Sequence, residues 1–293
     1  MLNPPATIIS GRAGLINARS QKLFPEFEIQ KPFLKWAGGK TQMISDILKF
    51  APKNFNKYIE PFIGGGAVYF NLNHSESIIS DLNEELVITY KQVKENVGET
   101  IDILEKYNNT EEFYYKTRAL DVNKLSYSER AARLIYLNKT CFNGLFRVNK
   151  KGEFNVPYGK RSGSFLNKEN LISASNYLRD TDIYHSDYKS VLKMFAKRGD
   201  FIFLDPPYQP VGKFSDFKRY TKEFFYENDQ IELAELFKEL TNKGCFVMLT
   251  NSDHPFILDL YKDFQIKIIE TKRLISSDPK TRKGIDIIVL GGL

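Results

Sequence analysis

Short apolar segments alternate with longer amphipathic stretches along most of the chain. The short segments predict buried strands, because each holds a few consecutive apolar residues and then stops at a polar residue or a turn signal. The predicted strands lie at about residues 58–60, 78–81, 183–186, 201–204, 245–249, 265–270 and 285–290. Strands that alternate with helices predict an α/β fold with a mostly parallel sheet. The polar loop between the last two strands is too short for a crossover helix, so these strands predict an antiparallel hairpin at the sheet edge.

Apolar residues at helical spacing and turn signals predict helices at about 41–50, 84–107, 111–120 and 128–139. The last two of these helices, with the loop after them, interrupt the alternation of strands and helices. We therefore expect a small helical domain at about 105–170, inserted between two parts of a larger domain at 31–104 and 171–293. Residues 1–30 show weak periodicity and are expected to form an extension outside the fold.

The excess positive charge of the chain is concentrated in one segment. The formal net charge is +6. Residues 133–165 contain seven basic side chains against the single acid Glu153, and the rest of the chain holds 35 basic and 35 acidic residues. A basic segment of this kind is typical of contact with a phosphate backbone, which indicates nucleic acid as a partner. The competing interpretation is a solvated loop rich in lysine.

Three classes of protein are not favoured by the sequence. No run of 18 apolar residues is present and the N-terminus lacks the basic-then-apolar pattern of a secretory signal, so neither a membrane span nor secretion is expected. Cys141 and Cys245 have no CxxC spacing and lie in apolar contexts, which predicts buried free thiols in a reducing cytosol. His74, His185 and His254 are far apart without a metal-ligand pattern, so no metal site is expected.

A glycine-rich loop follows the first predicted strand. Gly64, Gly65 and Gly66 let a ligand approach the backbone closely at the start of the next helix. The second strand ends in Asp81, where an acid is placed to bind ribose hydroxyls. The spacing does not match the G-x-G-x-x-G pattern of dinucleotide sites. The loop and the acid together predict a cofactor that contains a nucleoside.

Five successive predicted strands have polar ends: Glu60, Asp81, Asp187, Asp205 and Asn251. Parallel strands end at the same edge of a sheet, and open α/β sheets bind ligands outside this edge. We therefore expect the five side chains to line one rim. Such a rim indicates a functional site, because few folds without one would place so many polar groups together.

The only tryptophan, Trp36, lies between Lys35 and Lys40 in a turn that leads into a helix. An apolar ring beside ammonium groups can close over a small anionic ligand. Periodicity alone favours the other interpretation, in which Trp36 belongs to the core and the lysines are solvated. The segment is therefore a candidate ligand site that needs support from elsewhere in the chain.

The segment Asp205-Pro206-Pro207-Tyr208 ends a buried strand with a carboxylate, rigid carbonyls and an aromatic ring. These groups suit alkyl transfer to the exocyclic amine of a base, whose nitrogen is a poor nucleophile because its lone pair is delocalised. Asp205 can accept one N–H and a proline carbonyl the other, which holds the nitrogen in line with the donor, and Tyr208 can stack on the base. A base inside a duplex must be flipped out to reach such a pocket. The competing interpretation is a loop start with a surface aromatic.

Several segments in sequence order together resemble one family. They are Phe33-Leu34-Lys35-Trp36-Ala37-Gly38-Gly39-Lys40, Glu60-Pro61-Phe62-Ile63-Gly64-Gly65-Gly66, Phe142-Asn143-Gly144-Leu145-Phe146-Arg147-Val148-Asn149, Gly152-Glu153-Phe154-Asn155-Val156-Pro157-Tyr158-Gly159 and Asp205-Pro206-Pro207-Tyr208. From about residue 31 to 290 the chain resembles Dam-type DNA adenine-N6 methyltransferases of the D12 class, alpha group. The resemblance implies a Rossmann-like, S-adenosylmethionine-dependent methyltransferase sheet, with the insert at 105–170 as a small DNA-recognition domain.

The resemblance also implies roles for individual residues. The catalytic positions would be Asp205, Pro206 and Tyr208. The positions that bind S-adenosylmethionine would be Trp36, Lys40, Phe62, Gly64, Asp81, Asp187, Tyr188 and Asp205. The DNA-binding positions would be Lys35, Phe142, Asn143, Arg147 and Pro157. Among these, Arg147 matches an arginine that reads guanine in relatives that recognise GATC, a pairing that groove chemistry favours.

The implied activity is methylation of adenine N6 in double-stranded DNA, with GATC as the expected site. We expect a cytoplasmic monomer without a metal, from a bacterium, an archaeon or a phage. Cytosine-N4 methylation is one alternative, although those enzymes resemble a serine-led form of the segment at Asp205. A DNA-binding protein that has lost catalysis is another alternative, and four intact residues oppose it: Trp36, Lys40, Asp81 and Asp205. A nucleotide-dependent oxidoreductase is opposed by the glycine spacing and the basic segment.

Overall fold

The computed structural model describes residues 30–72, 74–149, 151–160, 162–209, 225–272 and 283–292. The expected extension at 1–30 lies outside the described residues, apart from Gln30. This side chain is buried, and its Nε2 donates a hydrogen bond to Oδ1 of Asn170 at 3.0 Å. The described part of the chain therefore begins in contact with helix α7 (Lys168–Leu178).

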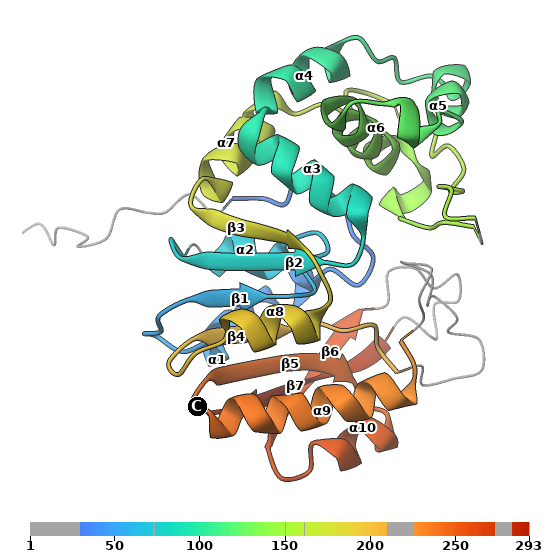
Figure 1. Cartoon of the computed structure of the whole chain (residues 1–293). Helices are drawn as coiled ribbons and strands as arrows, with labels where there is room; N and C mark the ends of the chain where they lie inside the picture. The colour runs from blue at the N-terminus through green and yellow to red at the C-terminus, as the bar shows by residue number, and fades with distance from the viewer. Residues whose placement is uncertain are drawn as a thin grey trace, which may run out of the picture.

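A seven-stranded mixed sheet forms the centre of the molecule (Figure 1). The strands are β1 (Tyr58–Glu60), β2 (Ser77–Asp81), β3 (Thr181–His185), β4 (Phe201–Leu204), β5 (Phe246–Ser252), β6 (Gln265–Lys272) and β7 (Lys283–Gly291). Their order is β3-β2-β1-β4-β5-β7-β6. The first five strands in this order are parallel to one another, and β7 is antiparallel to both β5 and β6. Each predicted strand is present, and both the Rossmann-like α/β class and the antiparallel edge hairpin are confirmed.

Three of the four predicted helices are present, the fourth is divided in two, and five further helices in the described part of the chain had no predicted range. The helices are α1 (Ile44–Phe50), α2 (Ala67–Leu72), α3 (Glu84–Glu95), α4 (Val97–Glu105), α5 (Glu111–Arg118), α6 (Tyr127–Thr140), α8 (Tyr188–Phe195), α9 (Glu227–Asn242) and α10 (Pro255–Leu260), besides α7. The single helix predicted at 84–107 is wrong, because Asn96 leaves helical geometry at φ −135° and ψ 41° and separates α3 from α4. Asn96 and the nearby Gly98 are both poor helix formers, which makes this the weakest place in the segment.

Helices cover both faces of the sheet (Figure 1). Along β4, Phe201 and Phe203 face one buried cluster, while Ile202 and Leu204 face the other. The first cluster packs against α1, α2, α3, α6 and α7, and the second against α8, α9 and α10. Burial on both faces explains why the parallel strands are apolar without alternation. Because helices cover both faces of the sheet, a ligand can reach these strands only at their ends.

Helix α6 connects the inserted segment to the rest of the core. Its start is defined by a capping box, in which the Ser126 side chain accepts from the backbone of Glu129 and the Glu129 carboxylate accepts from the backbone of Ser126. Tyr136 and Leu137 of α6 belong to the same buried cluster as Phe203 of the sheet. Residues 105–170, predicted as an inserted domain, thus share one buried apolar cluster with the sheet.

One residue of the predicted basic segment does not lie on the surface. Arg133 is only 6% exposed, and its guanidinium donates to the carbonyls of Thr117 and Arg118. These carbonyls end α5, where backbone acceptors have no partner within the helix. Assigning Arg133 to the surface charge was therefore wrong, and its role is to close the end of a neighbouring helix.

The remaining general expectations concern cysteines, metals and membranes. Cys141 and Cys245 are both free and buried, as predicted. Across the described parts of the chain, no three His, Cys, Asp or Glu side chains are grouped so that they could hold a metal ion. The same residues include no helix with the length and apolar character needed to cross a membrane.

Candidate active site

The strand order reverses between β1 and β4. From β1 the chain continues to β2 on one side, and from β4 it continues to β5 on the other. Loops that diverge at such a point leave a crevice outside the carboxyl ends of the strands. The glycine loop follows β1, and the Asp205 segment follows β4. The two segments that the sequence singled out are therefore neighbours across this crevice.

Lys40 joins the loop that contains Trp36 to the segment after β4. Its Nζ lies 2.6 Å from Oδ2 of Asp205 and 4.8 Å from the centroid of the Tyr208 ring, and it also donates to the carbonyl of Gly38. Lys40 and Asp205 are largely withdrawn from solvent, with 7% and 18% of their side chains exposed. A positive and a negative group with an aromatic ring thus share one small site.

Thr250 is part of this site but was not singled out in the sequence. Its Oγ1 donates a hydrogen bond of 2.7 Å to Oδ1 of Asp205. The residue is fully buried in β5, which pairs with β4 so that Leu249 lies opposite Leu204. A hydroxyl directly after four apolar strand residues was the available signal. Because the contact spans two strands, only the sheet register reveals it.

The ionisation of Asp205 depends on opposing effects. Burial raises the pKa of Asp205 above its usual value, and the ion pair with Lys40 and the hydrogen bond from Thr250 lower it again without cancelling the effect of burial. Asp286 of β7 also raises this pKa by its negative charge. Among the neighbouring groups, Lys40 thus lowers the pKa of Asp205 most strongly and favours its ionised form.

Replacing Lys40 with methionine is expected to shift the acid limb of the pH–rate profile upward. Loss of the ammonium group raises the pKa of Asp205 further, so that the carboxylate form is lost at a higher pH as the solution is acidified. The measurement is single-turnover methyl transfer to DNA from pH 5 upward. Thr250→Val, which removes a hydrogen bond but no charge, serves as the milder comparison. An acid limb at the same pH in Lys40→Met would contradict this account.

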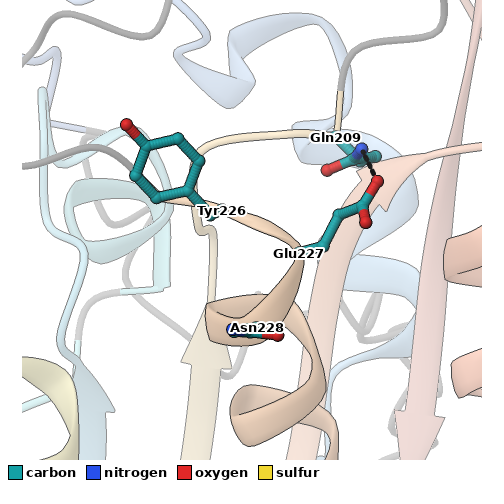
Figure 2. A pocket seen from close by; sticks show the side chains of 4 residues that line it. All are labelled: Gln209, Tyr226, Glu227 and Asn228. Carbon is teal, nitrogen blue, oxygen red and sulfur yellow. Dashed lines mark hydrogen bonds between the residues drawn. The ribbon is translucent and has the colours of Figure 1, made fainter.

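A hollow of about 310 Å³ lies beside Gln209, the residue that follows Tyr208 (Figure 2). Gln209, Tyr226, Glu227 and Asn228 line it, and Nε2 of Gln209 donates to Oε1 of Glu227 at 3.4 Å. Its walls are mostly polar and it is widely open. Neither Asp205 nor Lys40 lines this hollow, so it is separate from the group of Lys40, Asp205 and Tyr208.

The glycine loop is held in place by Asp81. Oδ2 of Asp81 accepts from the backbone N–H of Gly64 at 3.1 Å, and Oδ1 accepts from the backbone N–H of Asn83 at 2.9 Å. Burial raises the pKa of Asp81, and these hydrogen bonds oppose the increase. The loop lies directly against Trp36, because a Cβ on Gly64 would come within 2.8 Å of the indole. The glycine is therefore required both by φ +47° and by this contact.

Three aromatic rings form a cluster on the other side of the loop. The centroids of Phe62 and Tyr188 are 5.2 Å apart, and Phe225 lies 6.2 Å from Phe62 and 6.1 Å from Tyr188. Asp187 caps α8 by accepting from the backbone N–H and the hydroxyl of Ser190. Burial tends to raise the pKa of Asp187, but the hydrogen bonds from Ser190 lower it below its usual value. Phe225 was not predicted as a site residue, although the pair Phe224-Phe225 in the sequence was an available signal.

The predicted rim of five polar strand ends is correct at three positions and wrong at two. Asp81, Asp187 and Asp205 remain partly accessible. Glu60 is 2% exposed, and its carboxylate accepts hydrogen bonds from the Tyr58 hydroxyl at 2.8 Å and from the Tyr69 backbone N–H. Burial raises the pKa of Glu60 well above the usual range. Asn251 is completely buried. Helices that pack over these two strand ends remove them from the rim.

The predicted DNA-binding residues lie together beside the loop of Trp36. Asn138 of α6 accepts from the backbone N–H of Lys35 at 2.8 Å and donates to its carbonyl at 2.6 Å. A Cβ on Gly144 would come within 2.6 Å of the Lys35 side chain. Trp36 stacks on Phe146 with centroids 5.0 Å apart and planes at 21°. The segments predicted to bind DNA and S-adenosylmethionine are therefore in direct contact with each other.

Arg147 is exposed but its guanidinium is oriented by a neighbour. Its Nε donates to Oδ1 of Asn155 at 2.8 Å, and its Nη2 donates to the Asn155 carbonyl at 3.3 Å. Phe142 is 51% exposed, and its backbone N–H donates to the carbonyl of Pro157 at 2.9 Å. Asn143 beside it adopts a left-handed conformation at φ 56°. Four predicted DNA contacts thus lie on two adjacent chain segments joined by backbone pairing.

Comparison with known proteins places this arrangement in a family. The model of the D12 class N6 adenine-specific DNA methyltransferases matches residues 36–275. The Type II methyltransferase M1.LlaDCHI of Lactococcus lactis subsp. cremoris is 41% identical over 269 residues, covering 89% of this chain and 94% of that protein. The Type II methyltransferase M.MjaIII of Methanocaldococcus jannaschii is 43% identical over 276 residues, covering 86% and 95%.

A third relative carries a different name. The DNA adenine methylase of Haemophilus influenzae is 32% identical over 274 residues, covering 92% of this chain and 95% of that protein. The matches extend through the glycine loop, the Lys40–Asp205 site and the insert, and they confirm the family that the sequence segments indicated. The chain therefore belongs to the D12 class N6 adenine-specific DNA methyltransferases.

Proposed function

We propose that this enzyme methylates adenine N6 within a short specific duplex sequence, with GATC as the expected site, after flipping the base into the pocket formed by Asp205, Pro206 and Tyr208. The observation that supports this most directly is the Asp205 carboxylate, held by Lys40 and Thr250 beside the Tyr208 ring at the switch point of the sheet. The Asp205 carboxylate would accept a hydrogen bond from the amine of the target base, and the Tyr208 ring would stack on the ring of that base.

S-adenosylmethionine is the methyl donor of this family of enzymes, and when bound it supplies a methyl group activated on a sulfonium. We assign it to Trp36, Lys40, Phe62, Gly64, Asp81, Asp187, Tyr188 and Asp205. The described residues fit such a group. The Tyr188 hydroxyl is buried with no hydrogen-bond partner among them, and Asp81 presents a carboxylate beside the glycine backbone. Aromatic, carboxylate and hydroxyl groups suit the base, ribose and amino-acid parts of the donor.

Asp205 would act on the amine through its remaining lone pairs. An ionised carboxylate can accept about four hydrogen bonds, and Lys40 and Thr250 use one site on each oxygen. The carboxylate can therefore accept an N–H of the base while it stays fixed. Its negative charge stabilises the positive charge that develops on the nitrogen as the new bond forms. A proline carbonyl would accept the second N–H, and the Tyr208 ring would hold the plane of the base.

Base flipping follows from the position of these groups. The side chain of Asp205 is only 18% exposed, so a base paired inside a duplex cannot reach it. The target adenine has to leave the stack and enter between Tyr208 and the backbone. Phe142, with half of its surface exposed, is placed beside Asn143 to contact the base pair that the flipped adenine leaves behind.

Arg147 is proposed to read a guanine. The guanidinium has two edges that can donate two parallel hydrogen bonds, and Asn155 occupies the edge made by Nε and Nη2. The other edge, made by Nη1 and the second hydrogen of Nη2, stays available for the O6 and N7 acceptors of guanine. Asn155 thus selects which edge faces the groove. The insert at 105–170 is accordingly the proposed target-recognition domain.

Methylation of plasmid DNA that contains random sequence, followed by sequencing of the modified positions, tests this function. The expected result is N6-methyladenine confined to one short sequence with at least one guanine, GATC in the first instance. Modification of cytosine at N4 would show that the target base is cytosine and not adenine. Sequence-specific binding without modification would show a DNA-binding protein without catalysis. A restriction–modification role agrees with the names of two relatives, and a plasmid-protection assay with the matching nuclease would check it.

A further inference from the structure

A chain of buried amides lies behind the catalytic segment. Gln230 of α9 and Asn251 of β5 are both fully buried. Nε2 of Gln230 donates to the carbonyl of Pro207 at 2.9 Å, and Nδ2 of Asn251 donates to Oε1 of Gln230 at 3.1 Å. Oδ1 of Asn251 accepts from the backbone N–H of Gln209 at 3.2 Å. These bonds run from Pro207 through both side chains and return to the main chain at Gln209.

The direction of this chain is determined by the groups at its ends. The Pro207 carbonyl can only accept and the Gln209 N–H can only donate, so each amide has one orientation that satisfies both of its neighbours. The backbone N–H of Ser252 donates to Oδ1 of Asn251 at 2.8 Å and supports the same orientation. A flipped amide would place two acceptors or two donors against each other in a fully buried environment, which is unfavourable.

Tyr208 is enclosed by this circuit. The residue before it is held through its carbonyl by Gln230, and the residue after it is held through its N–H by Asn251. The hydroxyl of Ser252 also donates to the Gln209 carbonyl at 2.7 Å. The main chain on both sides of the Tyr208 ring is therefore anchored to α9 and β5, whose positions are set by the core.

The circuit also distinguishes the two prolines. Gln230 occupies the carbonyl of Pro207, whereas among the described residues no donor reaches the carbonyl of the buried Pro206. Proline offers a carbonyl without an N–H of its own, so the free acceptor next to Asp205 is the one at Pro206. The amine of a flipped base would thus find Asp205 and the Pro206 carbonyl as adjacent acceptors.

We propose that Gln230 and Asn251 are positioning residues for methyl transfer. They hold Pro207, Tyr208 and Gln209 so that the Pro206 carbonyl is the acceptor left for the target amine and the Tyr208 ring stays parallel to the base. Neither side chain touches the base or the donor. This inference rests on the proposed function of the Asp205 pocket.

Gln92 provides a matched control that tests whether Gln230 has only a structural role. Gln92 of α3 is also buried, and its Oε1 accepts from Nδ2 of Asn96 at 3.0 Å and from the Ser128 hydroxyl at 2.9 Å. It lies in the helical layer and contacts no residue of the active site. Gln230→Met and Gln92→Met remove the same buried amide at nearly constant volume, so their effects on stability should be comparable.

The test measures single-turnover methyl transfer, duplex affinity and melting temperature for both variants. Gln230→Met is expected to slow transfer by about 10- to 100-fold with duplex affinity unchanged, because small displacements of reacting groups are costly. Gln92→Met should lower the melting temperature without slowing transfer. A duplex with 2-aminopurine at the target adenine adds a second readout. Its fluorescence with Gln230→Met should move towards that with Tyr208→Ala, in which no ring stacks on the base.

Asn251→Asp provides a second variant in case Gln230→Met does not fold. It keeps the acceptor for the Gln209 and Ser252 N–H groups but turns the donor to Gln230 into an acceptor. The Gln230 amide can then satisfy only one neighbour, and slower transfer is expected again. Transfer at the wild-type rate in folded variants, or equal slowing in Gln92→Met, overturns the inference. Absence of adenine methylation by the unmodified enzyme would instead overturn the proposed function.

Discussion

Replacing Asp205 with alanine is expected to lower the rate of methyl transfer by about 1,000-fold or more, while binding to duplex DNA is largely preserved. The loss follows because the carboxylate both fixes the amine and stabilises charge in the transition state, and preorganised groups of this kind contribute factors of about 10²–10³ each. The proposed recognition residue Arg147 lies on the insert, and no hydrogen bond or ion pair joins it to Asp205 among the described residues. Single-turnover transfer of a labelled methyl group and fluorescence anisotropy with a labelled duplex measure the two quantities.

Asp200 offers the control for this experiment. Asp200 lies directly before β4, whereas Asp205 lies directly after it. The Asp200 side chain is buried and accepts hydrogen bonds from the backbone N–H groups of Lys57 and Lys197 at 3.2 and 2.8 Å. Asp200→Ala should reduce stability and leave the transfer rate of the folded enzyme unchanged. Retention of turnover by Asp205→Ala would refute the role given to this carboxylate, whatever happens to its affinity for DNA.

Replacing Arg147 with alanine is expected to relax the sequence preference at a single guanine. The discrimination lost is about 1–3 kcal/mol, the range for one bidentate arginine–guanine contact. The edge of the guanidinium that Asn155 leaves open supplies the two donors. The measurement compares kcat/KM for the expected site with kcat/KM for duplexes that each carry one changed base pair. Only substitutions at the guanine read by Arg147 should become better tolerated.

Lys151 gives a comparison of equal charge on the same hairpin. It is exposed, its backbone N–H donates to Oδ1 of Asn149 at 2.9 Å, and its ammonium group forms no hydrogen bond or ion pair with another described residue. Lys151→Ala should weaken binding to all sequences alike and reduce the dependence of affinity on salt. If Arg147→Ala behaves in the same way, with a uniform loss across sequences, Arg147 contacts phosphate and does not read a base.

Much of the scaffold was predictable because it depends on local pattern. Apolar runs of a few residues defined each strand, and the short polar connection between the last two strands required the antiparallel hairpin of β6 and β7. Apolar spacing predicted the start of α6 at about residue 128, close to the observed start at Tyr127, although the capping residues Ser126 and Glu129 were not used. The break at Asn96 was missed, since apolar residues continue at helical spacing on both sides of it and hide two poor helix formers.

Burial of polar groups was less predictable. Glu60, Asn251 and Arg133 were each expected at a surface, and each is buried with hydrogen bonds that compensate for lost solvent. The sequence marks these residues as polar but does not show which element covers them. Partners such as Tyr69 for Glu60 or Thr117 for Arg133 come from other elements of the fold.

The sequence by itself determined the α/β class, the family and the residues at the ends of β1, β2 and β4, because strand limits and glycine turns are encoded over a few neighbouring residues. Only the tertiary structure decided how these residues act together. It paired Lys40 with Asp205, brought Thr250 to the same carboxylate and enclosed Tyr208 between Gln230 and Asn251. These contacts join residues far apart in the chain, and their partners are selected by sheet register and by the packing of helices on the sheet.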